Sequence, residues 1–259
     1  MTHIARPSWY IHPERHVIET LLVLAISVIS IKRVFASNQH FRWSTSTEQD
    51  IEPPLLMKLT TSVVMALHIG YKMDKWMYMT APCNLTWIAY WSICYIPMSP
   101  QAIQIAYQLM IPFLAFPVLA FVAPENFATH LMERPFFYIH HILLVVFAMY
   151  LLRSGRASML PAGSTSALSS LLHQWMMAFG VFGVYMSGLI VPLSIYCGLN
   201  LNYVMSPPHN HEWYSGPWYR HFIVGYFAIK FLIIQIVVLM FELYHERRVQ
   251  SRRSRRKGE

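Results

Sequence analysis

The chain has few charged residues for its length. Only 12% of its 259 residues are charged, whereas 55% are hydrophobic, and this balance excludes an ordinary soluble surface and predicts a membrane protein. The first fifteen residues also lack the apolar stretch and the small-residue cleavage site of a secretory leader. We therefore expect the first helix to act as its own signal.

Cysteine and acidic residues are scarce as well. Three cysteines are too few for a disulfide scaffold. At most one bridge, Cys83 to Cys197, can form, because Cys94 lies in an apolar run without an evident partner. The net charge of +8 comes largely from the tail, where seven of the twenty basic residues occupy the last thirteen positions. The surplus is local, so we expect no nucleic-acid partner.

Long apolar runs are what the sequence has in quantity. A bilayer core needs about 20 apolar helical residues, and the sequence predicts seven such helices and no internal repeat. Pro112 and Pro117 predict a kink in the fourth, and Gly180, Gly183 and Gly188 predict close helix contact in the sixth. The seven runs are 17–36, 55–71, 83–98, 102–123, 136–152, 167–197 and 222–244.

Lysine and arginine are distributed unequally between the two sides of this predicted bundle. One side, which includes the C-terminal tail, carries thirteen of them and the other carries six, and short basic loops stay in the cytosol. The sequence therefore predicts an all-α polytopic membrane protein. Its parts are a lumenal segment 1–16, a single bundle 17–244 and a basic cytosolic tail 245–259.

Polar residues gather at the predicted lumenal face. Cys83 begins the third helix, His140 and His141 lie early in the fifth, and Glu19 lies early in the first. The loop between the sixth and seventh helices belongs to the same face. The orientation was derived from lysine and arginine alone. The clustering of these other polar residues therefore favours both the predicted topology and a functional site at this face.

Cys83 has three interpretations, as a buried small residue, as half of a disulfide or as a nucleophile. A free thiol titrates near 8.5, but a helix N-terminus and a nearby imidazolium both favour the thiolate. Pro82 is suited to the first turn of a helix, where its missing N–H is not needed. Cys83 would then lie among backbone amides that could stabilise an oxyanion. Cys94, about 16 Å deeper, is expected to be packing.

The histidines and Lys230 also have alternative interpretations. His140 and His141 are separated by about 100° around a helix, so one can face the bundle, either as a hydrogen-bonded interface histidine or as a catalytic base. His209 and His211 lack spaced metal-ligating partners, so we expect neither a metal nor a cofactor. Lys230 lies within the seventh helix, where it either reaches toward the headgroups or meets a phosphate or carboxylate.

Several stretches together resemble the transmembrane protein 164 family, which comprises polytopic endoplasmic-reticulum proteins regarded as cysteine-dependent acyltransferases. The resemblance covers most of the chain, and its most specific part is the loop from Asn200 to Arg220. The sequence departs from the family in the residues flanking Cys83, and His68 replaces an acidic residue and Tyr226 a histidine. The matching stretches are VIETLLVLA at Glu19, IGYK at Ile69, PCNL at Pro82, FYIHHILL at Phe137 and NLNYV with YSGPWYR in the loop.

This resemblance implies transfer of a fatty acyl chain through a thioester on Cys83, with His141 as general base and then acid. His140 stands where family members carry glutamine. The implied acceptor is a lyso-ether-phosphatidylethanolamine, the implied chain is polyunsaturated, and the implied location is the endoplasmic-reticulum membrane. The expected partners are phospholipid and lysophospholipid substrates and membrane lipids. Substrate-binding residues are expected to be Glu19, Asn84, His140, Asn200, Asn202, Tyr219, Arg220 and Lys230, with Arg220 suited to a headgroup phosphate.

Three other functions fit parts of the same pattern. A seven-helix receptor has this topology but needs a motif in its last helix that is not found. A transporter needs broken helices or paired charges at the midplane, where only Lys230 is available. A lipid hydrolase would use the same nucleophile with water as the acceptor. The tail RRSRR is typical of arginine-based retention signals and would also bind anionic lipid.

Overall fold

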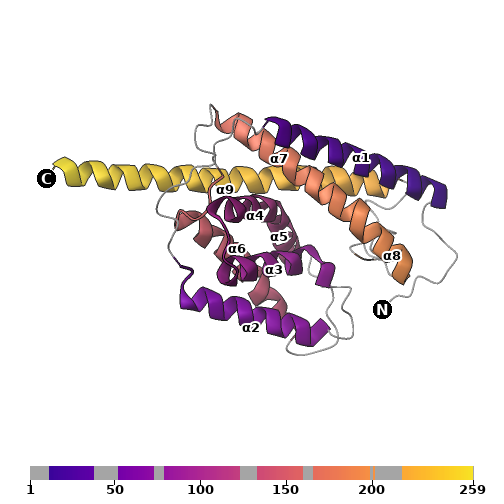
Figure 1. The fold of residues 1–259 in the computed structure, drawn as a ribbon, viewed down its shortest axis with the longest axis horizontal. Coiled ribbons are helices and arrows are strands. Elements are labelled where there is room, and N and C mark those ends of the chain that lie inside the picture. Colours follow the sequence, from indigo (N-terminus) through magenta and orange to yellow (C-terminus); the bar gives the residue numbers. More distant parts are fainter. Residues whose placement is uncertain are drawn as a thin grey trace. The chain divides into compact units, whose positions relative to one another are not determined.

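A computed structural model describes residues 12–37, 52–72, 79–122, 133–159, 166–198, 201 and 218–258, and their regular structure is helical (Figure 1). Within these ranges the helices form seven rods, because α4, η3 and α5 run on from one another, as do α7, η4 and α8. Each predicted run holds one rod, which confirms the all-helical fold. The elements are α1 (Pro13–Ser37), α2 (Leu55–Lys72), α3 (Pro82–Tyr95), α4 (Pro100–Met110), η3 (Ile111–Leu114), α5 (Ala115–Val122), α6 (Glu133–Arg153), α7 (Ala167–Val184), η4 (Tyr185–Ile190), α8 (Val191–Cys197) and α9 (Tyr219–Gly258).

Four stretches among the described residues are long and apolar enough to cross a membrane. They are Pro100–Val118, Pro135–Arg153, Leu168–Cys197 and Tyr219–His245, and Leu55–Gly70 is a shorter apolar helix. The chain is therefore a multi-pass membrane protein. Two predicted spans do not meet this standard of length and apolarity. Helix α3 has only 14 residues, about 21 Å of helix, and α1 carries charged residues near both ends. The orientation in the membrane stays a prediction.

Prolines account for the breaks within the rods. Pro112, which has no N–H to donate, lies in the 3₁₀ turn η3 between α4 and α5. Pro117 lies within α5, and the kink expected at these prolines stays a prediction. Pro192 follows the π-helical segment η4 directly, at the start of α8, and removes a donor from the helical ladder there. Gly198, with a φ of 66°, ends α8 in the left-handed conformation that suits glycine.

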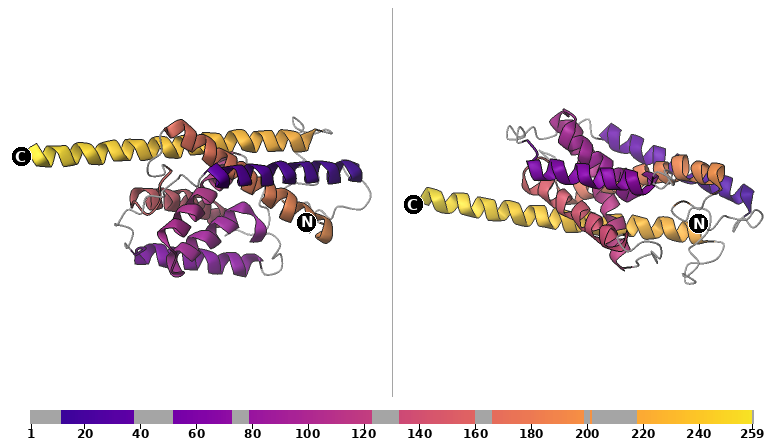
Figure 2. Two further views of the ribbon diagram at one scale, coloured as in Figure 1. Left: turned by 45° about the horizontal axis from the view of Figure 1, so that its top comes forward. Right: turned by 90° about the horizontal axis from the view of Figure 1, so that it is seen from below.

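The helices divide into two compact units. Unit 1 contains residues 1–40 and 173–230, and unit 2 contains residues 41–172 and 231–259. In unit 1, α1 packs on α7 (Figure 2). Gly180 and Gly183 make this approach close, because a Cβ added at Gly180 would lie 2.9 Å from the Ser27 carbonyl oxygen. The predicted close contact at these glycines is confirmed, and the single bundle over 17–244 stays a prediction.

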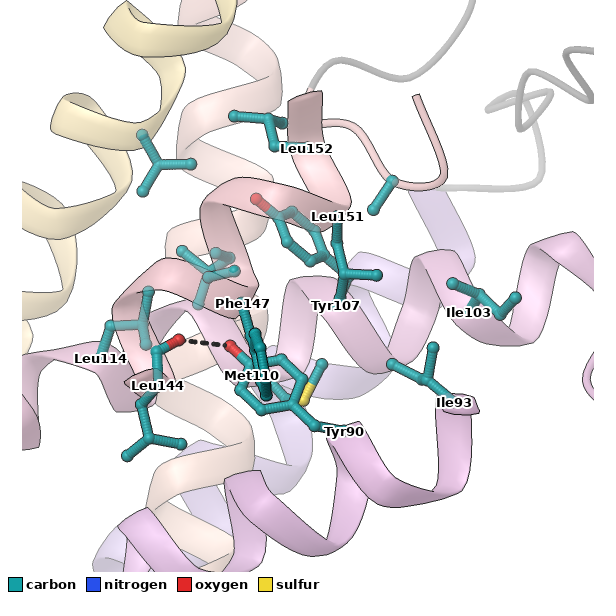
Figure 3. Close-up of a cluster of buried hydrophobic side chains, with 14 of the residues drawn as sticks. Tyr90, Ile93, Ile103, Tyr107, Met110, Leu114, Leu144, Phe147, Leu151 and Leu152 are labelled. Atoms are coloured by element: carbon teal, nitrogen blue, oxygen red, sulfur yellow. Dashed lines mark hydrogen bonds between the residues drawn. The ribbon is translucent and has the colours of Figure 1, made fainter. Parts of the chain in front are cut away.

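Unit 2 is built around a core of aromatic and aliphatic side chains from α3, α4, η3 and α6 (Figure 3). Tyr90 is fully buried, and its hydroxyl donates to the Leu144 carbonyl at 2.9 Å. Phe147 lies edge-on to the rings of Trp87 and Tyr90, at centroid distances of 5.5 and 5.8 Å. These rings are buried, and the tyrosine hydroxyl has a hydrogen-bond partner. Both interactions hold α3 against α6.

Helices α2 and α3 pack side by side in opposite directions (Figures 1 and 2). Tyr95, the last residue of α3, donates its hydroxyl to the Lys58 carbonyl at 2.9 Å and accepts from Ser62 at 2.8 Å. The end of α3 therefore lies beside the start of α2. It follows that the start of α3, where Cys83 lies, is at the end of unit 2 where α2 finishes.

Candidate functional site

Cys83 lies in the first turn of α3, directly after Pro82, which occupies the start of the helix as predicted. The N-cap residue of this helix, Ala81, makes no side-chain capping hydrogen bond. The thiol is half-buried and packs against the core of unit 2, so it is neither sealed in the interior nor fully exposed. Cys83, Cys94 and Cys197 all belong to the described part of the chain, and none forms a disulfide. The alternative of a Cys83–Cys197 bridge is therefore wrong, whereas the buried packing role of Cys94 is confirmed.

His140 and His141 lie in the second turn of α6, and both are buried. His140 Nδ1 is 3.1 Å from the Phe136 carbonyl oxygen, and His141 Nδ1 is 2.6 Å from that of Phe137. Because a carbonyl oxygen only accepts, each Nδ1 carries the hydrogen. In the neutral form of such a ring the lone pair is on Nε2, which is the atom a general base uses.

His68 is a third buried histidine beside this pair. Its ring meets the edge of the His140 ring at a centroid distance of 4.9 Å and lies 5.2 Å from the Phe136 ring. His68 Nδ1 is 2.8 Å from the Val64 carbonyl oxygen, so the same tautomer results. The sequence marked His68 only as a departure from the family, although an ionisable residue inside a predicted span is a signal of function.

These contacts place the thiol and the imidazoles at the same end of unit 2. His68 is one turn from the end of α2, and its ring reaches the first turns of α6. Cys83 lies twelve residues before Tyr95, about 18 Å along α3, and so at the level where α2 ends. Asn84, the neighbour of Cys83, is only 2% exposed, and its predicted role in substrate binding stays a prediction.

Unit 1 contains a separate polar network between α1 and the start of α9. The Glu19 carboxylate lies 2.6 Å from Arg15 Nε and 3.6 Å from Arg220 Nη1. Arg220 also donates to Thr20 Oγ1 and His16 Nδ1, both at 3.0 Å. Arg220 therefore ties α9 to α1, with Glu19 as its counter-ion. The role predicted for Glu19 and Arg220 at a lipid headgroup stays a prediction.

His16 is part of this network and precedes the predicted span. Burial, followed by the neighbouring Arg220 cation, lowers the pKa of His16 from 6.5 to about 4. His16 is then neutral at physiological pH, which agrees with Nδ1 accepting from the guanidinium. His16 was not among the predicted site residues, although its position about one turn before Glu19 was a signal in the sequence.

The other predicted site residues are divided between the units and the undescribed ranges. Tyr219 is buried in unit 1. Lys230 Nζ lies 4.4 Å from the centroid of the Tyr226 ring, a cation–π contact one turn toward the helix start that the two predicted alternatives did not include. Asn200, Asn202, His209 and His211 lie outside the described residues. Among the described ones, no group of three His, Cys, Asp or Glu is arranged to hold a metal.

Comparison with known proteins identifies the family. A family model described as the TMEM164 family matches residues 10–241. This match includes every described helix from α1 to α8 and most of the apolar part of α9. No solved structure matches the chain.

Proposed function

Because the chain belongs to the TMEM164 family, we propose that it is a membrane acyltransferase that uses Cys83 as its nucleophile. The observation that carries the proposal is the position of Cys83 in an uncapped helical first turn, at the same end of unit 2 as three histidines whose Nε2 atoms carry the lone pair. The N–H groups at a helix start favour a thiolate and an oxyanion alike.

The proposed reaction has two halves. In the first, His141 Nε2 takes the proton of the Cys83 thiol, and the thiolate attacks the ester carbonyl of a phospholipid. The imidazolium then returns its proton to the departing lysophospholipid oxygen, which leaves an acyl thioester on Cys83. In the second half, His141 deprotonates the hydroxyl of an acceptor lysophospholipid, which attacks the thioester and regenerates the thiol.

The Cys83 backbone amide would stabilise the tetrahedral oxyanion in both halves, because it lies beside the sulfur that bonds to the reacting carbon. Pro82 has no N–H, and the Asn84 and Leu85 amides donate to the Ala81 carbonyl. His140 is held by His68 and Phe136. We therefore give it a positioning role beside His141. The acceptor is proposed to be a lyso-ether-phosphatidylethanolamine and the chain polyunsaturated, in keeping with the family. The basic tail supports location in the endoplasmic-reticulum membrane.

The test is acyl transfer by the purified protein from labelled phosphatidylcholine to a set of lysophospholipids. We expect Cys83→Ala to abolish transfer and His141→Gln to lower it by about 10²- to 10⁴-fold. Cys94→Ala removes a buried thiol of the same helix and is the matched control, so it should retain transfer. Wild-type rates in Cys83→Ala would refute the nucleophile. Release of free fatty acid alone by the wild type would identify a hydrolase.

A further inference from the structure

The loop that follows α6 contains a buried arginine. Gly155, with a φ of 72°, turns the chain at the end of α6, and the Gly155 and Ala157 amides donate back to the Leu152 and Leu151 carbonyls. Arg156, between them, is only 7% exposed. Burial of a guanidinium to this extent is rare unless the charge is paired.

Two other helices hold this loop in place. The Gln104 side chain from α4 accepts from the Ser158 amide at 2.9 Å and donates to the Ser158 carbonyl. The Glu242 carboxylate from α9 accepts from the Ser158 hydroxyl and from the Met159 amide. The position of Arg156 is therefore fixed by the surrounding structure, as a binding site requires.

The Arg156 guanidinium itself lacks partners. Its Nε and Nη1 atoms are inaccessible and have no hydrogen-bond acceptor within the described structure, and the ion pairs found there do not include Arg156. The nearest carboxylate in the loop's own contacts, Glu242, already uses both oxygens. Burial of a cation without a partner costs free energy, and a bound anion would recover part of that cost.

Basic and acidic side chains both lie at the end of unit 2 where Arg156 is found. The charges of Arg156 and Lys58 both act on the Cys94 thiol, which places Arg156 at the end of unit 2 where α2 begins and α3 finishes. Lys58 is paired with the exposed Glu52 at 3.3 Å, and Arg153 is exposed one turn away. This is the end of unit 2 opposite Cys83, and it is predicted to face the cytosol.

We propose that Arg156 binds a phosphate group, supplied by an anionic phospholipid at the cytosolic surface. The planar guanidinium matches two phosphate oxygens as a fork, and the ends of membrane helices lie at the level of lipid phosphates. The site is distinct from Cys83, and neither proposal depends on the other.

The test uses the full-length protein, freed of lipid in detergent, and short-chain phosphatidic acid as the probe. Short-chain diacylglycerol, which lacks the phosphate, and inorganic phosphate are the comparison ligands. The readout is the shift of the thermal unfolding midpoint with ligand concentration. The variants are Arg156→Gln, Arg156→Lys and, as a matched control at the same end, Arg153→Gln.

We expect phosphatidic acid to stabilise wild type and Arg153→Gln, with binding about tenfold or more weaker in Arg156→Gln. Without ligand, Arg156→Gln should be at least as stable as wild type, because it removes an unpaired buried charge. Arg156→Lys keeps the charge without the fork and should bind more weakly than wild type. An equal effect of inorganic phosphate would support the phosphate site and assign it to a soluble ligand.

Three results would overturn the proposal. The first is an absence of stabilisation of wild type by either phosphate compound. The second is equal binding by wild type, Arg156→Gln and Arg156→Lys, or equal stabilisation by diacylglycerol. The third is a clear loss of stability in ligand-free Arg156→Gln, which would show that the guanidinium is paired within the protein.

Discussion

At the scale of single residues, the three histidines of unit 2 share one feature that decides their chemistry. Each Nδ1 faces the carbonyl four residues earlier in its helix, so the helix itself selects the tautomer. The lone pair on Nε2 is then directed away from the helix backbone. The spacing of His140 and His141 predicted that one of them can face the bundle, whereas both are buried. Their partnership with His68 depends on how α2 packs against α6.

His16 provides a residue-scale prediction that depends on pH. Its pKa is about 4 in the folded protein and near 6.5 when unfolded, so the unfolded state binds the extra proton first. Stability from neutral His16 is present above pH 6.5 and falls as the pH drops toward 4. At pH 5 the loss amounts to roughly 2 kcal/mol.

The measurement is the difference in thermal unfolding midpoint between pH 7.5 and pH 5 for wild type and for His16→Gln, whose amide oxygen can still accept from Arg220. We expect wild type to lose more stability than the variant. Identical losses would contradict a neutral, buried His16. All other residues are the same in the two proteins, so their contributions cancel in the comparison.

At the scale of helices, the apolar runs predicted the ends of the rods to within a few residues, except for the C-terminal end of α9, because hydrophobic length and flanking prolines act locally. Two features of the helices were not predicted from the sequence. The π-helical segment η4 arises before Pro192 inside a run that otherwise predicts an uninterrupted helix. Helix α9 also continues to Gly258, although its last turns carry too many arginines to resemble a span.

The contact between α1 and α7 gives an element-scale prediction. A Cβ at Gly180 would lie 2.7 Å from Ile31 Cγ1 and 2.9 Å from the Ser27 carbonyl oxygen, so the two helices would have to separate. We expect Gly180→Ala to destabilise the protein by about 1–3 kcal/mol, measured by thermal unfolding in detergent.

Gly188→Ala is the matched control, because its nearest neighbours would be 3.7 and 3.8 Å away. It should be neutral or slightly stabilising, since alanine favours helix over glycine by about 1 kcal/mol. Equal destabilisation by the two substitutions would show that the close packing at Gly180 is not what holds α1 against α7.

At the scale of the whole molecule, the distribution of charge predicts the orientation. Cys83 and the histidines lie at one end of unit 2, and Arg156 lies at the other. The end with Arg156 and the basic last turns of α9 are both predicted to be cytosolic. The candidate nucleophile could be predicted from the chain because a proline, a cysteine and an apolar run are adjacent there. Arg156 could not, because only the folded loop reveals that it is buried.

Protection of terminal tags in sealed microsomes tests this orientation. A protease added outside should remove a C-terminal tag and leave an N-terminal tag intact until detergent opens the vesicles, because basic segments stay cytosolic. Cleavage of the N-terminal tag in sealed vesicles would contradict the orientation. It would also place the Cys83 end on the cytosolic side.

The most direct test of the central claim is detection of the acyl group on the protein. Wild type and Cys83→Ser are incubated with phosphatidylcholine and no acceptor, and the peptide containing residue 83 is then analysed by mass spectrometry. We predict an acylated peptide in wild type that neutral hydroxylamine cleaves and that disappears when a lysophospholipid is added. An unmodified Cys83 in a preparation that still transfers acyl chains would contradict the mechanism.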